Sequence, residues 1–133
     1  MSLRKAHKSI YEVVRSTLDA SSATSHIKAS IGTRFQAEQN PEVIIQQNSF
    51  DTNELNSRDF GTFEISVYCY SNSYTEAANV ADTIFLAVQN NALYDLVEGD
   101  VTTTYHLKNL DLFLEYFDED GYESNVLIRA IEA

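Results

Sequence analysis

Several residue types are scarce in this chain of 133 residues, and each scarcity excludes a class of protein. The single cysteine, Cys69, cannot form a disulfide within one chain, and an unpaired thiol is typical of a reducing compartment. Four glycines leave little material for a phosphate-binding loop, and no Gly-x-Ser-x-Gly elbow is present. No run approaches the roughly 18 apolar residues that span a membrane. The N-terminus lacks the apolar segment of a signal peptide. We therefore expect cytoplasmic synthesis and no membrane partner.

Basic residues are also scarce. Nine Lys and Arg stand against twenty Asp and Glu, which gives a net charge of −11 and a pI near 4.5. Proteins that bind the nucleic-acid backbone need Lys and Arg to displace counterions, so this balance argues against sequence-independent DNA or RNA binding. It argues equally against docking on an anionic membrane. An acidic surface repels DNA, which is useful where DNA has to slide past without sticking.

Recognisable catalytic and metal-binding patterns are lacking as well. The three histidines are far apart and have no zinc-site spacing: His7, His26 and His106. The acidic stretch Asp118–Gly121 lacks the rest of a calcium-binding loop and is better explained as a solvated hairpin turn. Glu64 and Glu115 could form a carboxylate pair, but both fall on polar strand positions, where solvated charge is the default. We predict no catalytic, cofactor-binding or metal-binding residue. A small enzyme or ligand-binding protein remains the alternative.

The most readable part of the chain is Phe60–Asn91. Apolar and polar residues alternate over Phe60–Tyr70, which predicts a strand with one buried face, formed by Phe63, Ile65, Val67 and Cys69. Ser73 and Glu76 then have the spacing of a capping box, in which each side chain bonds the backbone of the other residue. The residues after Ser73 predict a helix to Asn90 with an apolar stripe: Ala77, Val80, Ala81, Ile84 and Val88.

The remaining segments complete an α+β pattern. Leu3–Ala20 predicts an amphipathic helix, and Thr24 or Ser25 caps a short helical turn that ends at Gly32. The other predicted elements are an edge strand at Thr33–Phe35, a strand at Val43–Gln47, a long loop at Asn48–Asp59, an apolar turn at Leu93–Val97 and a C-terminal hairpin from Val101–Leu107, Leu110–Tyr116 and Tyr122–Glu132. We predict a single domain over residues 1–133, with a largely antiparallel sheet of four or five strands covered on one face by two main helices.

The predicted fold does not bury all of the apolar side chains. Leu86 lies opposite the apolar stripe of its helix, and the hairpin carries leucines on one face but Phe113 and Phe117 on the other. A lone exposed leucine is common and needs no explanation. Two helices, however, bury only one face of a sheet, so the surplus predicts a second copy of the chain as partner.

The order of elements resembles a family of phage tail-completion proteins. The resemblance is carried by the N-terminal helix, the small-residue break, Ile31-Gly-Thr-Arg-Phe35 and Pro41-x-Val-Ile-Ile45, and then by the long loop, the strand Phe63–Tyr70, the helix start Ser73–Ala77 and the closing hairpin. These are the tail terminator and head-to-tail joining proteins of long-tailed phages. The acidic turn Asp118–Asp120 has no family role that we can assign.

The resemblance implies a structural virion protein without cofactor or catalysis. Such a subunit forms a homo-oligomeric ring, typically of six copies, at the head-proximal end of the tail tube, and it is assembled in the host cytoplasm. The ring ends tube polymerisation and contacts the tube protein and the neck or connector protein, while DNA passes through unbound. Another neck, head-completion or baseplate ring stays open as an alternative. We predict subunit contacts at Leu86, Phe113 and Phe117, and a docking loop with Phe50, Asp51, Glu54, Leu55, Arg58 and Asp59.

Overall fold

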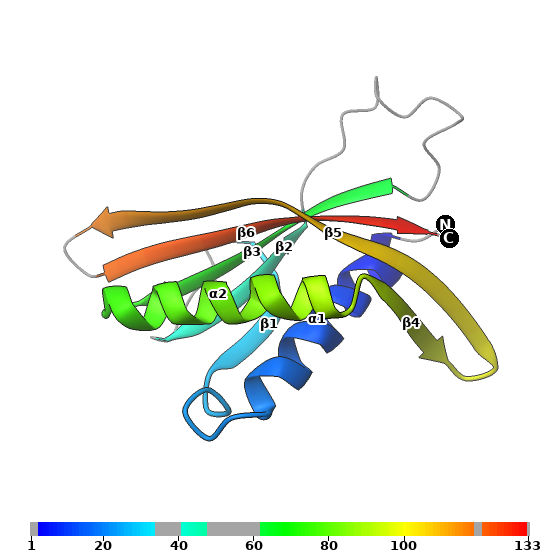
Figure 1. The fold of residues 1–133 in the computed structure, drawn as a ribbon, viewed down its shortest axis with the longest axis horizontal. Coiled ribbons are helices and arrows are strands. Elements are labelled where there is room, and N and C mark those ends of the chain that lie inside the picture. The colour runs from blue at the N-terminus through cyan, green and yellow to red at the C-terminus, as the bar shows by residue number, and fades with distance from the viewer. Residues whose placement is uncertain (1–2, 34–40, 48–61, 119–120, 133) are drawn as a thin grey trace.

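The computed structural model describes residues 3–33, 41–47, 62–118 and 121–132, which form two helices and six strands. The elements follow in the order α1 (Leu3–Asp19), β1 (Lys28–Gly32), β2 (Glu42–Gln47), β3 (Thr62–Ser71), α2 (Tyr74–Asn90), β4 (Leu93–Glu98), β5 (Val101–Asp118) and β6 (Gly121–Glu132) (Figure 1). The α+β class predicted from the sequence is confirmed, although the sheet has six strands where we expected four or five.

All six strands belong to one sheet in the order β1-β2-β3-β6-β5-β4. Only β1 and β2 pair in parallel, and every other neighbouring pair is antiparallel, so the predicted antiparallel character holds. The two edge strands, β1 and β4, therefore run in the same direction at opposite edges of the sheet. The β4–β5 hairpin projects at one end of the molecule, and the far end of β5 lies at the other (Figure 1).

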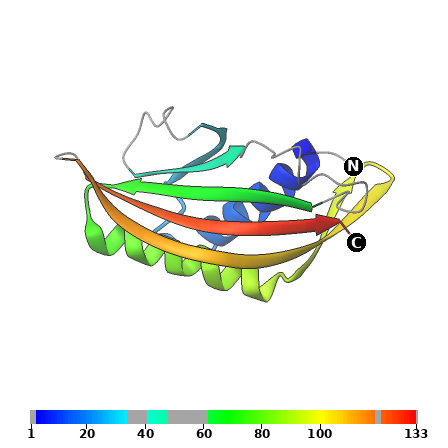
Figure 2. The same cartoon turned by 90° about the horizontal axis from the view of Figure 1, so that it is seen from above.

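Both helices pack on the same face of the sheet (Figure 2), which we call the helix face; the opposite one is the outer face. Apolar side chains at helical spacing on α1, among them Ile10 and Val14, meet the strand residues that point the same way. The predicted buried face of β3 is confirmed, since the side chains of Phe63, Ile65, Val67 and Cys69 are all buried there. Helix and sheet thus share one core.

The start of α2 explains why the helix begins where it does. Ser73 is the N-cap, and its hydroxyl accepts a hydrogen bond from the backbone N–H of Glu76, as predicted. The other half of the capping box runs through a relay. The Glu76 carboxylate accepts from the hydroxyl of Ser71 at 2.6 Å, and that hydroxyl accepts from the Ser73 backbone N–H. The last residue of β3 is thereby tied to the first turn of α2.

Two predicted segments are wrong in type. Lys28–Gly32, expected as a helical turn, is the edge strand β1, and Leu93–Glu98, expected to begin as an apolar turn, is the edge strand β4. In the first case Ile27 and Ile31 fit a helical spacing, but β2 offers a parallel partner that the sequence does not show. The strand expected at Thr33–Phe35 does not include Thr33, and its other two residues lie outside the described part of the chain.

A β-bulge divides β5 into two halves. The register with β6 shifts between Asn109 and Asp111, so Leu107 faces the helices before the shift and Leu112 faces them after it. The extra residue increases the local twist, and β5 curves along its length (Figure 2). The amide of Asn109 donates to the Phe85 carbonyl at 2.8 Å, which fixes the strand to α2 at the bulge.

The outer face is also buried in part. Ile44 on β2 and its register partner Tyr68 on β3 are 1% and 8% exposed although both point away from the helices. Ser66 on the same face is buried, and the rings of Tyr68 and Tyr70 stack at 6.4 Å between centroids. We had expected the polar side of β3 to face solvent, but this part of the outer face is buried. The exposed apolar surface lies further along the sheet.

Candidate interaction surfaces

The side chain of Leu86 is 56% exposed on the outward side of α2, as its helical position predicted. Phe113 is 44% exposed and lies opposite Asn125 on the outer face, so the hairpin does present an aromatic ring away from the helices. The side chain of Phe117 lies outside the described residues, and so does the whole predicted docking loop with Phe50, Asp51, Glu54, Leu55, Arg58 and Asp59. The predicted contacts at Leu86 and Phe113 stay predictions.

A further apolar group lies around β4, where sequence reasoning had placed a turn. Leu93, Val97 and Val101 are 62%, 60% and 54% exposed, whereas Leu96 between them is 1% exposed. Leu96 faces α1 and the core, and Leu93 and Val97 face away because neighbouring strand positions alternate. The sequence Leu-Tyr-Asp-Leu-Val-Glu over Leu93–Glu98 has no alternation of apolar and polar residues that would have identified this strand. Its brevity and its position directly after α2 hid it.

A cluster of opposite charges joins α1 to β4. The Glu98 carboxylate lies 3.0 Å from the Lys8 ammonium, 3.2 Å from the Arg4 guanidinium and 4.0 Å from the Lys5 ammonium. Hydrogen bonds from Lys8 and then Arg4 lower the pKa of Glu98 below its ordinary value. On the same interface the Tyr94 hydroxyl donates to the Glu12 carboxylate at 2.6 Å. Three of the nine basic residues are thus gathered around one carboxylate, which leaves the rest of the surface more acidic than the net charge suggests.

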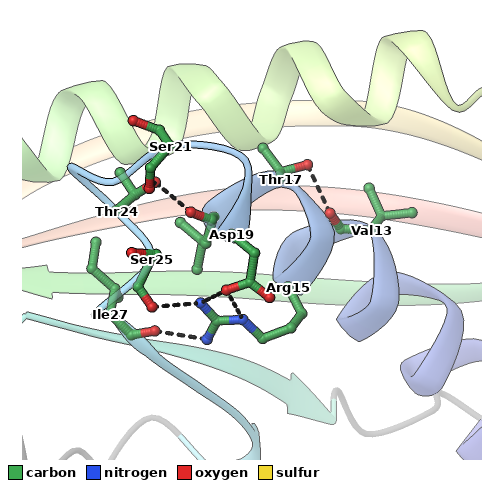
Figure 3. A network of polar contacts seen from close by, with 9 residues as sticks. Val13, Arg15, Thr17, Asp19, Ser21, Thr24, Ser25 and Ile27 are labelled. Atoms are coloured by element: carbon green, nitrogen blue, oxygen red, sulfur yellow. Dashed lines mark hydrogen bonds and ion pairs between the residues drawn. The ribbon is translucent and has the colours of Figure 1, made fainter.

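A second polar network fixes β1 against the end of α1 (Figure 3). The Arg15 guanidinium donates to the carbonyls of Ile27 and Ser25 and bonds the Asp19 carboxylate one helical turn later. The Thr24 hydroxyl donates to the Leu18 carbonyl at 2.7 Å. The Thr24 bond satisfies a backbone carbonyl at the end of the helix, where no intrahelical partner exists, and the Arg15 bonds hold two carbonyls of the connection after the helix. The connection therefore delivers the chain into β1 at a defined position.

The candidate carboxylate pair is not formed. Glu64 bonds Arg129 at 3.1 Å, and the strand register places Glu115 opposite Glu123, six residues away along β6. That separation is roughly 20 Å at the rise of a strand. Within the described residues, no three His, Cys, Asp or Glu side chains come together as metal ligands. The described helices are also too short or too polar to cross a membrane.

Two buried titratable groups, Cys69 and Tyr105, have a raised pKa. Burial raises the pKa of the Cys69 thiol to about 12, with the Glu76 carboxylate adding to the effect. The reactive thiolate is therefore not populated at neutral pH. Burial also raises the pKa of Tyr105, which packs in the core beneath β4.

The comparisons with known proteins find a likeness of structure only. No protein-family model matches the chain, and no curated protein matches its sequence. Among solved structures it is similar to the gp17 protein of bacteriophage SPP1, with a TM-score of 0.55 and 14% sequence identity. The alignment covers 95% of this chain and 90% of that one, so the likeness includes nearly every element described above. This chain therefore shares its fold with a bacteriophage protein.

Proposed function

We propose that this chain is a structural subunit of a phage virion and forms a ring, typically of six copies, at the head-proximal end of a tail tube. The ring ends tube polymerisation and joins the tail to the neck, without catalysis or cofactor. The observation that carries the proposal is the exposed apolar surface on both layers of the fold, with Leu86 on the helix layer and Leu93, Val97 and Phe113 on the sheet. A soluble single domain gains nothing from so many exposed large side chains, whereas a ring buries them between copies.

Two further observations support a structural role in a virion. The fold is shared with a bacteriophage protein over nearly the whole chain. The net charge of −11 suits a ring that DNA traverses, because like charges keep DNA from adhering to the channel. The surroundings of Cys69 and of Glu64 fit the same reading, since the thiol is protonated and the carboxylate is taken up by Arg129.

The test of self-association is a substitution at Leu86. Leu86→Asp replaces the exposed apolar side chain on α2 with a charged one. We expect the assembly to shift towards monomer in sizing with light scattering. The control is Gln89→Asp, which adds the same charge to an exposed polar position of the same helix. An assembly that withstands Leu86→Asp removes Leu86 from the interface.

The position of the ring in the virion is tested by docking. We propose that the segment Asn48–Asp59 carries the contact with the tube or neck protein, because it is long, polar and acidic with only Phe50 and Leu55 as apolar anchors. A chain with the middle of this segment deleted should fold and self-associate but fail to bind tail tubes in a pull-down. Binding to neck rings or baseplates in place of tubes would assign the chain to another ring of the virion.

A further inference from the structure

The strands β1 and β4 form open edges of the sheet that the fold itself does not use. In the part of the chain that the structure describes, β1 pairs only with β2 and β4 pairs only with β5. An open edge presents a row of unpaired backbone N–H and C=O groups, which favours pairing with another strand. Proteins that stay monomeric cover or block such edges. Here both edges are strands of five or six residues without proline.

The direction of the free backbone groups on β4 follows from its pairing with β5. The Leu107 N–H donates to the Ala92 carbonyl at 2.8 Å, so the alternate residues that follow Ala92 direct their backbone groups towards β5. Leu93, Asp95 and Val97 then direct their N–H and C=O groups to the open edge. The side chains of the same three residues lie on the outer face, where Leu93 and Val97 are largely exposed.

The two edges carry complementary side chains. On β4 the exposed Asp95 lies between Leu93 and Val97, and on β1 the exposed Lys28 lies on the same outer face. Ile31 on β1 is 47% exposed, although it is the register neighbour of the buried Ile45. On the outer face one edge thus offers a carboxylate and the other an ammonium, whereas the exposed Ile31 lies on the helix face.

From these features we propose that β4 of one copy pairs with β1 of the next copy, so that the sheet continues through the assembly. This inference rests on the proposed ring and names the contact that closes it. Because β1 and β4 run in the same direction, continuing the sheet with its helix face on one side makes the pair parallel. When Lys28 lies opposite Asp95, the outer-face residues of the two strands lie beside each other. A shift of the register by one residue would place outer-face residues of one strand beside helix-face residues of the other.

The contact is heterologous, since two different edges meet. A heterologous contact repeats from copy to copy and closes into a ring when its rotation permits. It leaves Leu86 and Phe113 free to contact the same neighbour or the next ring, because they lie on α2 and on a central part of the hairpin. The polar network around Arg15 holds β1 in place before assembly, so the pairing requires little ordering of that edge.

The experiment is a charge-reversal cycle within one chain, measured by light scattering over a dilution series. Lys28→Asp and Asp95→Lys should each raise the concentration at which the assembly dissociates by about tenfold, because attraction between the edges becomes repulsion. The double variant restores the attraction in reverse and should return to within about twofold of the unmodified chain. Circular dichroism of each variant confirms that the fold is intact.

Matched controls separate the β1 and β4 edges from the rest of the sheet. Lys108→Asp and Asp111→Lys reverse exposed charges on β5, beyond the part of that strand that pairs with β4, and we expect dissociation to change by no more than about twofold. A second pair tests the backbone. Val97→Pro removes an N–H that faces the open edge and should dissociate the assembly, whereas Val97→Thr keeps that N–H and should be milder.

Each outcome of these measurements either supports or overturns the edge pairing. An assembly that withstands both edge reversals, or one that the double variant fails to restore, overturns the edge pairing and leaves the proposed ring standing. Dissociation by the β5 controls at the same level assigns the contact to this part of β5 and also overturns the pairing of β4 with β1. An unmodified chain that is monomeric at every concentration overturns the ring together with the edge contact.

Discussion

Leu93 and Leu96 provide a matched test of how β4 is placed. Both are leucines on one short strand, yet the structure leaves Leu93 62% exposed and Leu96 1% exposed. Leu96→Ala should destabilise the fold by about 2–5 kcal/mol, since it removes a fully buried side chain and leaves a cavity against α1. Leu93→Ala loses only about a third of the burial of a full leucine, which is worth about 0.5–1 kcal/mol. The two changes should therefore differ by about twofold or more in free energy of unfolding.

Thermal unfolding followed by circular dichroism measures this difference. For a domain of this size each kcal/mol shifts Tm by about 3–5 °C, so Leu96→Ala should lower Tm by about 10 °C and Leu93→Ala by only a few degrees. Both variants are compared at a concentration where the chain is monomeric, because assembly adds to apparent stability. Equal losses would show that the two faces of β4 are assigned wrongly. Above the assembly concentration, Leu93→Ala should weaken association, and Leu96→Ala should do so only through the fold.

Two further predictions concern positions away from the apolar surface. Gly121→Ala should cost roughly 1–3 kcal/mol more than Gly99→Ala in urea unfolding, because an added Cβ at Gly121 lies 2.6 Å from the Ser71 carbonyl oxygen whereas at Gly99 it meets nothing within 4 Å. Equal costs would contradict the close approach. The cations of α1 lower the pKa of Glu98 below 4.5, so its charge stabilises the fold above that pH and the contribution is lost as the pH falls further. Between neutral pH and about pH 3, the free energy of unfolding of the Glu98→Gln variant should therefore fall less than that of the unmodified chain. Parallel profiles of unfolding free energy against pH for the two chains would contradict this.

The elements with their own local signals were predictable. The Ser73 cap and the apolar stripe after it define α2 to within a residue, and the alternation of β3 defines its buried face. Both patterns arise from neighbouring residues, so one sequence suffices to read them. The exposure of Leu86 followed from its place on the helical wheel in the same way.

The elements that depend on distant partners were missed. β1 is a strand because β2 pairs with it in parallel, and the spacing of Ile27 and Ile31 fits a helical turn equally well. β4 was hidden because it is short and follows α2 with only two residues between them. The bulge near Asn109 had a signal, since the apolar positions change from odd numbers up to Leu107 to even numbers from Leu112. A change of phase inside one long strand indicates an extra residue, and reading it would have predicted the curvature of β5.

The central claim is that copies of this chain bury one another's exposed apolar surface in a closed ring. Negative-stain imaging of the purified protein, with mass from light scattering on the same sample, tests it most directly. The account predicts closed rings of uniform diameter and a mass that is a whole multiple of the 15.0 kDa chain, typically six copies. Particles of single-chain size with a mass of one chain at high concentration would contradict it.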